Sequence, residues 1–233
     1  MDLKNARVLV TGGSSGIGKA TARTLKEAGA KVWITGRDEE KLKAVCDELG
    51  VKGMVLDQSQ YDTIAPAIKK IAEESGGFDV LINNAGHGWR KMLGEITIED
   101  FEKIFSTNVF GLTLLTQEVL PYLIGQSSGH IINVASTAAI RGYASGSVYS
   151  SSKFALRGLT ECWRAELRQH NIRVILVNPS EVPTAFNQPG RIERSDEPSK
   201  LTSDEIAHTI KAALEMDNRG FIPEVTVWAT NPQ

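Results

Sequence analysis

The chain has 233 residues, and its 26 Lys and Arg against 28 Asp and Glu give a formal net charge of −2. This balance argues against a dedicated nucleic-acid-binding protein, which usually carries a strongly basic surface. Two cysteines cannot build a disulfide framework, so a reducing cytoplasm is the expected location. The longest apolar stretch, 109–123, is interrupted by polar residues and is shorter than the roughly 20 residues that span a membrane, so no membrane association is expected.

Short apolar runs alternate with longer segments of helical period along the chain. The expected strands cover residues 7–11, 31–35, 53–57, 80–83, 130–135 and 173–178, with a late apolar run at 225–229. The expected helices cover residues 16–28, 39–49, 61–75, 97–125, 148–170 and 203–216. Parallel strands covered on both faces read as near-continuous apolar runs. The alternation therefore predicts a doubly wound parallel α/β sheet of about seven strands, with helices on both faces.

Local signals set the expected boundaries. Asp38 and Ser147 are the predicted N-caps of the second helix and of the long helix that starts at 148. The helix 97–125 is expected to break near 105–107. Only 187–200 is poor in hydrophobic residues, and it is too short to separate two domains. We therefore expect a single dinucleotide-binding and catalytic domain spanning 1–233, with a mobile substrate lid over 185–201.

A glycine-rich loop lies between the first predicted strand and the first predicted helix. Its sequence is TGGSSGIG, from Thr11 to Gly18. Such a loop provides a tight turn, lets the backbone approach a pyrophosphate and allows close packing of the helix on the strand, which is typical of a Rossmann-type fold. The N–H groups and positive dipole at the helix start would then face the phosphates. The expected cofactor contacts in this loop are Gly12, Ser14, Ser15, Gly16, Ile17 and Gly18.

The same segment matches the GxxxxGK spacing of a nucleotide-triphosphate loop, at Gly13, Gly18 and Lys19. That loop uses a Ser or Thr hydroxyl at the next position to bind Mg²⁺, and Ala20 stands there. A phosphoryl-transfer enzyme is therefore disfavoured. A glycine turn without any ligand stays as a further alternative.

The end of the second predicted strand indicates which dinucleotide is bound. An acidic residue there would accept from the ribose 2′-OH of NAD. Here the strand ends at Gly36 and Arg37 follows. Because a guanidinium pairs with phosphate oxygens, Arg37 favours NADP(H), while NAD(H) stays possible. A solvated surface charge is the other interpretation of Arg37.

A tyrosine and a lysine stand four residues apart on a predicted helix, at Tyr149 and Lys153. This spacing places them on one helix face. Tyrosine titrates near pH 10, and a nearby ammonium would favour the phenolate and lower that pKa. Ser136 closes the predicted strand 130–135, and ligands bind at such strand ends in open α/β sheets.

Together these motifs resemble the short-chain dehydrogenase/reductase (SDR) family in its compact one-domain form. The resemblance runs from Arg7 to about Thr184 and includes an NNAG motif at 83–86 and the usual interval of 13 residues between Ser136 and Tyr149. It implies a catalytic set of Asn108, Ser136, Tyr149 and Lys153. The further cofactor contacts it implies are Asp57, Asn84, Ala85, Gly86, Tyr149, Lys153, Pro179, Val182 and Thr184. One departure is Ser180, which replaces a glycine and makes positive φ costly beside the nicotinamide.

The resemblance implies interconversion of a carbonyl and a secondary alcohol by hydride transfer. Tyr149 would donate the proton, Ser136 would hold the carbonyl oxygen, Lys153 would bind the ribose and lower the pKa of Tyr149, and Asn108 would position a water. The expected substrate is a small molecule, and the family implies a homodimer or homotetramer joined through the helices near 107–125 and 148–170. A non-catalytic dinucleotide-binding regulator is the alternative. A sugar-nucleotide epimerase or dehydratase is disfavoured, because only about 50 residues follow Thr184.

The histidines give weaker signals. No His or Cys residues are paired at metal-ligand spacing, so no metal is expected. His87 directly follows Asn-Ala-Gly and could reach the substrate, and an ordinary loop residue is the alternative interpretation.

Overall fold

The computed structural model describes residues 1–186 and 194–231, and in this part of the chain the strands form one parallel sheet. The strand order is β3-β2-β1-β4-β5-β6-β7. The strands are β1 Arg7–Val10, β2 Lys31–Gly36, β3 Lys52–Val55, β4 Val80–Asn83, β5 Gly129–Val134, β6 Ile172–Pro179 and β7 Glu224–Val227. The predicted doubly wound parallel sheet of seven strands is therefore confirmed.

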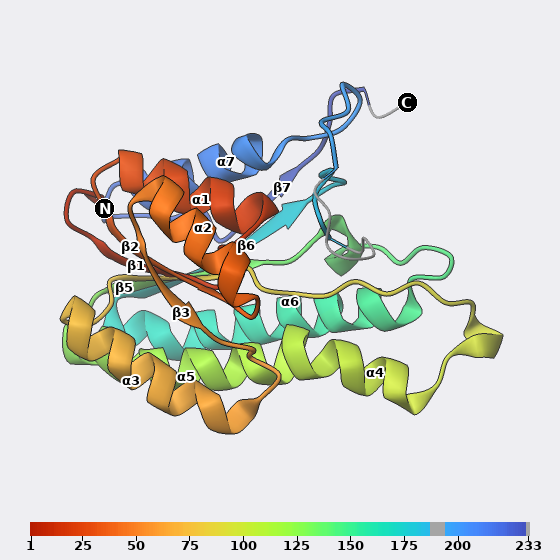
Figure 1. Ribbon diagram of the computed structural model, residues 1–233, viewed down its shortest axis with the longest axis horizontal. Coiled ribbons are helices and arrows are strands. Elements are labelled where there is room, and N and C mark those ends of the chain that lie inside the picture. Colours follow the sequence, from red (N-terminus) through yellow and green to blue (C-terminus); the bar gives the residue numbers. More distant parts are fainter. Residues whose placement is uncertain (187–193, 232–233) are drawn as a thin grey trace.

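Helices cover both faces of this sheet (Figure 1). One layer contains α1, α2 and α7, and the other contains α3, α4, α5 and α6. Their bounds are α1 Gly16–Glu27, α2 Glu39–Leu49, α3 Ile64–Ser75, α4 Ile98–Phe105, α5 Leu112–Gly125, α6 Ser147–Leu167 and α7 Ser203–Glu215.

A separate hydrophobic core lies on each face of the sheet. Under α1 and α7, Leu25 and Ile210 pack against strand residues such as Ile34. On the other face, Ile68 of α3 and Val119 of α5 pack against the opposite side of the strands. Because both faces are covered, the central strands are buried along almost their whole length, which explains their near-continuous apolar sequence.

The edge strand β3 differs from that expectation. Its residues Lys52–Val55 are mostly exposed, and Val55 is 48% exposed. An edge strand has one unpaired side, and charged residues there oppose pairing with a second chain. Lys52 fits this role, and its ammonium lies 5.1 Å from the centre of the Trp33 ring.

One predicted boundary is wrong, while two are confirmed. The α-helix expected over 97–125 is interrupted at the predicted place, because α4 ends at Phe105 and a π-helical segment, Ser106–Gly111, carries the chain into α5. Ser147 is not an N-cap but the first residue of α6, and Gly146 is the capping residue. Asp38 does cap α2, since its side chain accepts from the Lys41 N–H at 3.0 Å.

Two features bear on partners and ligands. No helix in the described ranges is both long and apolar enough to cross a membrane. Over the same ranges, no three His, Cys, Asp or Glu side chains are placed to bind a metal.

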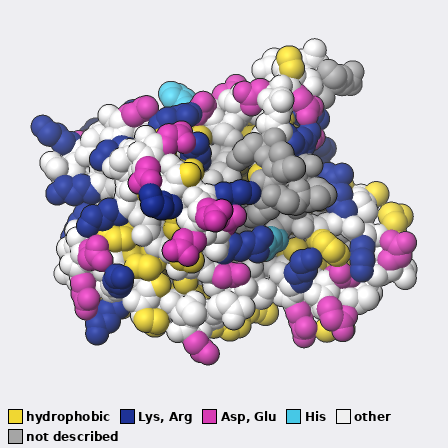
Figure 2. All heavy atoms as spheres, in the orientation of Figure 1, with side chains coloured by type: hydrophobic (Ala, Val, Ile, Leu, Met, Phe, Trp, Pro, Cys, Tyr) yellow, Lys and Arg dark blue, Asp and Glu magenta, His cyan; other side chains and the backbone are white. Residues whose placement is uncertain are grey.

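On the face seen in Figure 2, basic and acidic side chains are mixed rather than gathered in one large patch. The predicted lid spans 185–201, of which 187–193 lies outside the described residues.

Candidate active site

The sheet order creates a topological switch point between β1 and β4. From β1 the chain moves outward to β2 and β3, and then returns across the sheet to β4. In open parallel sheets, ligands bind at the carboxyl ends of the strands beside such a point. The loops after β1, β2, β4, β5 and β6 carry the residues that the sequence motifs indicate, so these loops meet at one edge of the sheet.

The loop after β1 requires glycine at specific positions. Gly12 and Gly16 have φ angles of 64° and 48°, which residues with side chains rarely adopt. A Cβ at Gly16 would lie 2.9 Å from Thr184 Cγ2, and one at Gly18 would lie 2.2 Å from the Gly12 carbonyl oxygen. The loop therefore folds tightly over the start of α1 and lies against the segment that follows β6.

The NNAG segment after β4 holds this loop in place. The Asn84 side-chain nitrogen donates to the carbonyl oxygens of Thr11 and Gly12, at 3.0 and 3.2 Å. The Thr11 hydroxyl accepts from the backbone N–H groups of Asn84 and Ala85, both at 3.0 Å. Asn84 thus holds the glycine loop in place, a structural role that was not predicted for it.

The start of α1 is suited to an anion. Side-chain oxygens of Asp38, Thr97 and Thr202 cap the helices α2, α4 and α7. The hydroxyl of Ser15 makes no such bond at α1, and no acidic residue stands in the first turn of that helix. The positive end of the helix dipole is therefore left without a neighbouring carboxylate of its own helix. Together with the glycine cradle, this end fits the pyrophosphate of a dinucleotide.

A second group of polar side chains lies where the adenosine end of a dinucleotide would bind. Arg37 is exposed at the end of β2, and a Cβ at the preceding Gly36 would lie 2.8 Å from the hydroxyl oxygen of Ser14. His87 reaches this group from the loop after β4, and its Nε2 lies 3.1 Å from Arg37 Nη1. The His87 side chain therefore points toward Arg37 at the end of β2.

Asp57, which follows β3, is part of the same group. Its carboxylate accepts from the backbone N–H and the hydroxyl of Ser59, at 3.0 and 2.7 Å. Burial alone would raise the pKa of this carboxyl, but the Ser59 hydrogen bonds and the positive charge of Arg37, together with that of His87 when its ring is protonated, hold it below its usual range. Asp57 is therefore ionised at neutral pH and can accept hydrogen bonds.

The predicted catalytic side chains gather around the carboxyl end of β5. Tyr149 and Lys153 share one face of α6, with Lys153 Nζ 5.8 Å from the centre of the Tyr149 ring. Lys153 is only 4% exposed, and its ammonium donates to the Val134 carbonyl oxygen at 3.1 Å. Ser136 hydrogen-bonds Tyr149, and its hydroxyl oxygen accepts from the Ala138 N–H at 3.1 Å. One turn of α6 and the end of β5 thus bring the three side chains together.

Burial dominates the titration of this group. Burial raises the pKa of Tyr149 above its ordinary value, and the hydrogen bond from Ser136 lowers it by less. The direction is opposite to the lowered pKa that the sequence predicts for Tyr149. Burial also lowers the pKa of Lys153 to about 8, because a charged ammonium is poorly solvated there. Tyr149 is therefore protonated at neutral pH, while Lys153 is close to its titration range.

Asn108 is positioned by the π-helical segment Ser106–Gly111. Its amide nitrogen donates to the His87 carbonyl oxygen at 2.8 Å and to the Ser152 hydroxyl at 3.1 Å. Its amide oxygen accepts from the His87 N–H at 2.8 Å. Asn108 is 1% exposed. It therefore links the loop after β4 to the α6 helix that carries Tyr149.

Comparison with known proteins agrees with this geometry. The family model for short chain dehydrogenase matches residues 6–195. The chain is 30% identical over 229 residues to an uncharacterized oxidoreductase of Staphylococcus epidermidis, and the match covers 97% of each chain. The chain belongs to the short-chain dehydrogenase family. It is accordingly an NAD(P)-dependent dehydrogenase/reductase, as the sequence predicts.

Two solved structures of SDR proteins are similar over almost the whole chain. One is a metagenomic short-chain oxidoreductase in complex with NADP, with 33% identity, a TM-score of 0.86 and 99% coverage of both chains. The other is a 3-ketoacyl-(acyl-carrier-protein) reductase of Brucella melitensis complexed with NADH, with 26% identity and a TM-score of 0.89. That match covers 99% of this chain and 100% of the other.

The SDR loop after β6 accommodates its unusual serine. Ser180 is not among the residues with positive φ in the described chain, and its N–H donates to the Val227 carbonyl oxygen at 2.9 Å. The backbone here thus has no need of glycine. Further along, Thr184 contacts the glycine loop, and the ring of Phe186 lies edge-on to Tyr149 at 5.8 Å between centres. The segment after β6 therefore reaches both the cofactor loop and the proposed proton donor.

Sequence reasoning missed the buried polar residues that support the SDR site. Asn83 donates to Thr116 Oγ1 and Asn133 Oδ1, both at 2.9 Å, and Asn133 donates to Thr160 Oγ1 at 2.8 Å. These bonds join β4 and β5 to α5 and α6 beneath the site. The available signal was the presence of two asparagines inside otherwise apolar strands.

Gln58 was missed as well. It is 4% exposed and donates to the Thr107 carbonyl oxygen at 2.8 Å. Its own carbonyl oxygen would lie 1.9 Å from a Cβ at Gly111. Gln58 thus satisfies a backbone group of the π-helical segment, and Gly111 makes room for it. The contacts of Gln58 with Thr107 and Gly111 could not be found from sequence spacing, because tertiary packing brings these residues together.

Proposed function

We propose that this SDR enzyme interconverts a carbonyl and a secondary alcohol with NADP(H), and that Tyr149 is its general acid and base. The observation that supports this best is the group formed by Tyr149, Lys153 and Ser136 beside the glycine loop, at the carboxyl edge of the sheet. This group supplies a proton donor, a cation and a hydrogen-bond donor at one place. A bound nicotinamide would supply or accept the hydride.

Each side chain of the group has a separate task. Tyr149 is protonated at neutral pH, since burial raises its pKa, and it donates this proton to the carbonyl oxygen of the substrate. The Ser136 hydroxyl holds the same oxygen, because a fixed donor stabilises the charge that develops there. Lys153 lies behind Tyr149, where its charge favours the phenolate that is left after proton transfer.

Residues of the strand-end loops would hold the cofactor. Backbone groups of the glycine loop would bind the pyrophosphate at the start of α1, and Lys153 would bind the nicotinamide ribose. The loops after β4 and β6 would line the ribose and the nicotinamide. The proposed contacts are Gly12, Ser14, Ser15, Gly16, Ile17, Gly18, Arg37, Asp57, Asn84, Ala85, Gly86, Tyr149, Lys153, Pro179, Val182 and Thr184.

Arg37 is the basis for proposing NADP(H) rather than NAD(H). It stands in the position where an acidic residue would bind the ribose 2′-OH, and a guanidinium binds a phosphate there instead. The similar metagenomic enzyme was solved with NADP, and the similar Brucella reductase was solved with NADH. The family thus accepts both dinucleotides, and the choice depends on side chains at this edge.

A dinucleotide-binding regulator without turnover is the alternative function. Such a protein would need the glycine loop but not a tyrosine, a lysine and a serine arranged for proton transfer. Here Lys153 is a buried ammonium that donates to the main-chain oxygen of Val134, and burying a charge costs stability. A group that costs stability and has no role in binding the adenosine end favours catalysis over mere binding.

A homodimer or homotetramer is also proposed. Large apolar side chains are exposed on the π-helical segment, α5 and α6, where Phe110 is 51%, Leu114 36% and Phe154 45% exposed, respectively. Exposed apolar patches of this kind usually mark protein interfaces. Light scattering should therefore give a multiple of the single-chain mass, and replacing Leu114 by Glu should lower that multiple. A single-chain mass for the unaltered protein would refute the proposal.

Three further predictions accompany this function. The segment 185–201 is proposed as the lid of the substrate site, since Phe186 contacts Tyr149. We expect Phe186→Ala to raise the KM for the carbonyl substrate more than the Kd for NADPH.

A single domain and a cytoplasmic location also stay predictions. Limited proteolysis can check the first and cell fractionation the second. Cys46 and Cys162 are both free thiols, as a reducing compartment allows.

The most direct experiment is a screen of NADPH oxidation against a panel of ketones and aldehydes, repeated with NADH. We expect turnover of at least one carbonyl class, with higher kcat/KM for NADPH than for NADH. Binding of NADPH without turnover of any carbonyl, and without oxidation of any alcohol by NADP, would support the regulator instead.

A further inference from the structure

We propose that His87 is, together with Arg37, a second determinant of binding to the 2′-phosphate of NADP(H). This inference rests on the proposed NADP(H)-dependent function. The sequence motifs did not identify His87 as a cofactor contact, and this inference places it at the adenosine end of the cofactor.

The strand order brings the two residues together. Arg37 follows β2 and His87 lies four residues after β4. In the sheet, β2 and β4 flank β1, whose own loop is the glycine cradle for the pyrophosphate. The two side chains therefore converge above the end of β1, with Arg37 Nη1 and His87 Nε2 3.1 Å apart. A phosphate on the ribose next to that pyrophosphate would arrive where they meet.

The chemistry of this contact is informative. Arginine nitrogens can only donate hydrogen bonds. The His87 Nε2 atom must therefore accept, which requires the neutral ring with its proton on Nδ1. A 2′-phosphate carries roughly −1.5 to −2 charge at neutral pH, as monoester phosphates do. Such an anion favours the protonated ring, so that Arg37 and His87 would both donate to phosphate oxygens instead of contacting each other.

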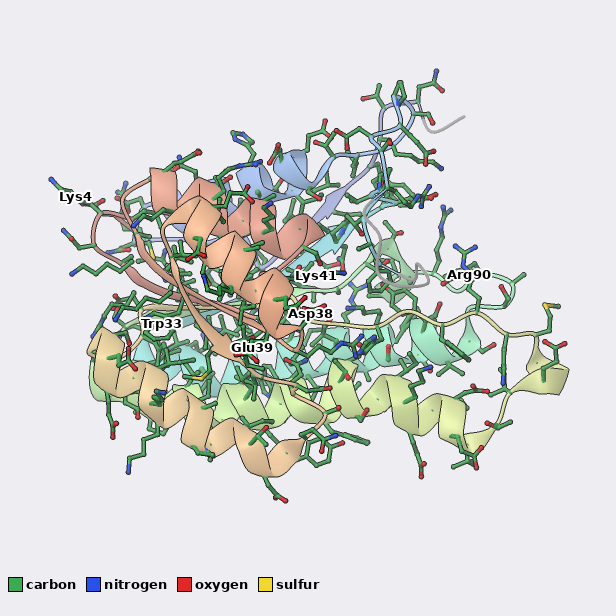
Figure 3. All side chains as sticks on the ribbon, viewed as in Figure 1. Lys4, Trp33, Asp38, Glu39, Lys41 and Arg90 are labelled. Carbon is green, nitrogen blue, oxygen red and sulfur yellow. The ribbon has the colours of Figure 1, made fainter. Side chains whose placement is uncertain are left out.

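The charges at this edge give His87 a role beside Arg37. The carboxylate of Asp57 interacts with both Arg37 and His87. Asp38, Glu39 and Lys41 lie close behind Arg37, and Figure 3 shows them at the start of α2. Part of the Arg37 charge is thus offset by carboxylates. A protonated His87 adds a second positive charge that can face a phosphate.

His87 is also held in position for this role. Its N–H and carbonyl group both bond to the buried Asn108 side chain, at 2.8 Å each. The backbone on either side of the imidazole is therefore fixed by two hydrogen bonds. Because this backbone is already ordered, binding the phosphate costs less conformational entropy than it would if the loop had to become ordered on binding.

The test measures binding rather than turnover. Kd values for NADPH and NADH would be determined by quenching of protein fluorescence for the unaltered enzyme, His87→Ala, His87→Gln and Arg37→Ala. His208→Ala is the matched control, since His208 is exposed on α7, in the layer away from α6. Adenosine 2′,5′-bisphosphate and adenosine 5′-monophosphate would serve as competing probes that differ only in the 2′-phosphate.

We expect His87→Ala to lower the ratio of the NADH Kd to the NADPH Kd by about tenfold, as loss of one charge-assisted hydrogen bond predicts. Arg37→Ala should lower it by roughly 30- to 100-fold, because a guanidinium can form two such bonds. The His87→Gln ratio should lie between those of the unaltered enzyme and His87→Ala, since the amide donates without charge. The double variant should lose less than the product of the single effects, because the two side chains share one ligand group.

Two results would overturn the proposal. An unchanged ratio in His87→Ala, with a lowered ratio in Arg37→Ala, would reject His87 while leaving the NADP(H) preference intact. Equal weakening of both dinucleotides and both adenosine probes would show that His87 only supports the loop. If Arg37→Ala also left the ratio unchanged, the proposed cofactor preference itself would fail.

Discussion

The two ends of the proposed cofactor cleft are built in different ways. At the catalytic end, Asn108, Ser152 and Lys153 are all at most 4% exposed and are bonded to the main chain or to each other. At the adenosine end, Arg37 is exposed and His87 is half-buried, and both lie on loops. The groups proposed to carry out the chemistry are thus fixed by the core, whereas the groups proposed to select the dinucleotide can change without disturbing the fold.

The first prediction concerns the catalytic end and has the largest expected effect. Tyr149→Phe removes the proton donor but keeps the ring that packs edge-on to Phe186. We expect kcat to fall by at least about 10³-fold, in line with the loss of a general acid. The Kd for NADPH should change by less than about threefold, because one neutral hydrogen bond contributes little to binding.

Retention of turnover in Tyr149→Phe would contradict the assignment of the general acid. Loss of NADPH binding in this variant would show that the catalytic end and the adenosine end do not act independently. The control is Tyr143→Phe, which alters the nearby exposed tyrosine and should leave kcat almost unchanged.

The second prediction tests whether the catalytic end is maintained at the expense of stability. The pKa of Lys153 is about 8 in the folded chain and ordinarily 10.5. Between these pH values the unfolded chain binds more protons, so the free energy of unfolding should rise with pH through this window. The shift corresponds to about 3 kcal/mol of stability that is lost below pH 8. Urea unfolding from pH 7 to 10 measures it.

In Lys153→Met this slope should disappear, and the variant should be the more stable protein near neutral pH. The reaction should respond in the opposite direction, with kcat for carbonyl reduction falling as pH rises through about 8, because Lys153 loses its charge there. A slope in unfolding free energy that persists in Lys153→Met would show that another group titrates.

The third prediction concerns Asn108, which joins the two ends. Asn108 bonds His87 at the adenosine side and Ser152 on α6 at the catalytic side. Asn108→Ala should therefore weaken NADPH binding and reduce kcat together, each by about tenfold for lost hydrogen bonds of a buried amide. Kinetics and fluorescence titration of the same preparation would measure both.

A change in kcat alone, with NADPH affinity retained, would show that Asn108 acts only at the catalytic end. Thr116→Val is a suitable control, since it also removes a buried hydrogen bond, from Asn83, but does not touch the loop of His87.

The smallest expected effect is at Ser180. The residue does not use positive φ, so glycine offers no conformational advantage there. We expect Ser180→Gly to change the Kd for NADPH by less than twofold and to lower stability by at most about 1 kcal/mol, through added freedom of the unfolded chain. A large gain in affinity would show that the serine distorts the nicotinamide side of the site.

The proximity of Tyr149 and Lys153 could be predicted from the sequence, whereas the grouping at the proposed adenosine end could be predicted only in part. Tyr149 and Lys153 are one helical turn apart, so their proximity follows from local geometry. Arg37 could also be found, because it directly follows a strand. The partner His87 is 50 positions away and meets Arg37 only because β2 and β4 flank β1. Spacing along the chain does not contain that information.

The same limit explains two local features that the sequence did not show. The α-helix is interrupted near 105–107 as expected, but by a π-helical segment, whose wide turn depends on Gln58 and on the space left by Gly111. The expected lowering of the pKa of Tyr149 took account of the neighbouring ammonium but not of burial, which has the larger effect. Both outcomes depend on tertiary packing.

The central claim is that Tyr149 transfers a proton while the cofactor delivers a hydride to a carbonyl carbon. Its most direct test is a single-turnover reaction with NADPH that carries deuterium at the transferred position of the nicotinamide, followed by mass spectrometry of the product. We predict a secondary alcohol with one deuterium on its carbinol carbon for the unaltered enzyme, and none for Tyr149→Phe saturated with the same cofactor. Equal deuterium transfer by the two proteins would contradict the account.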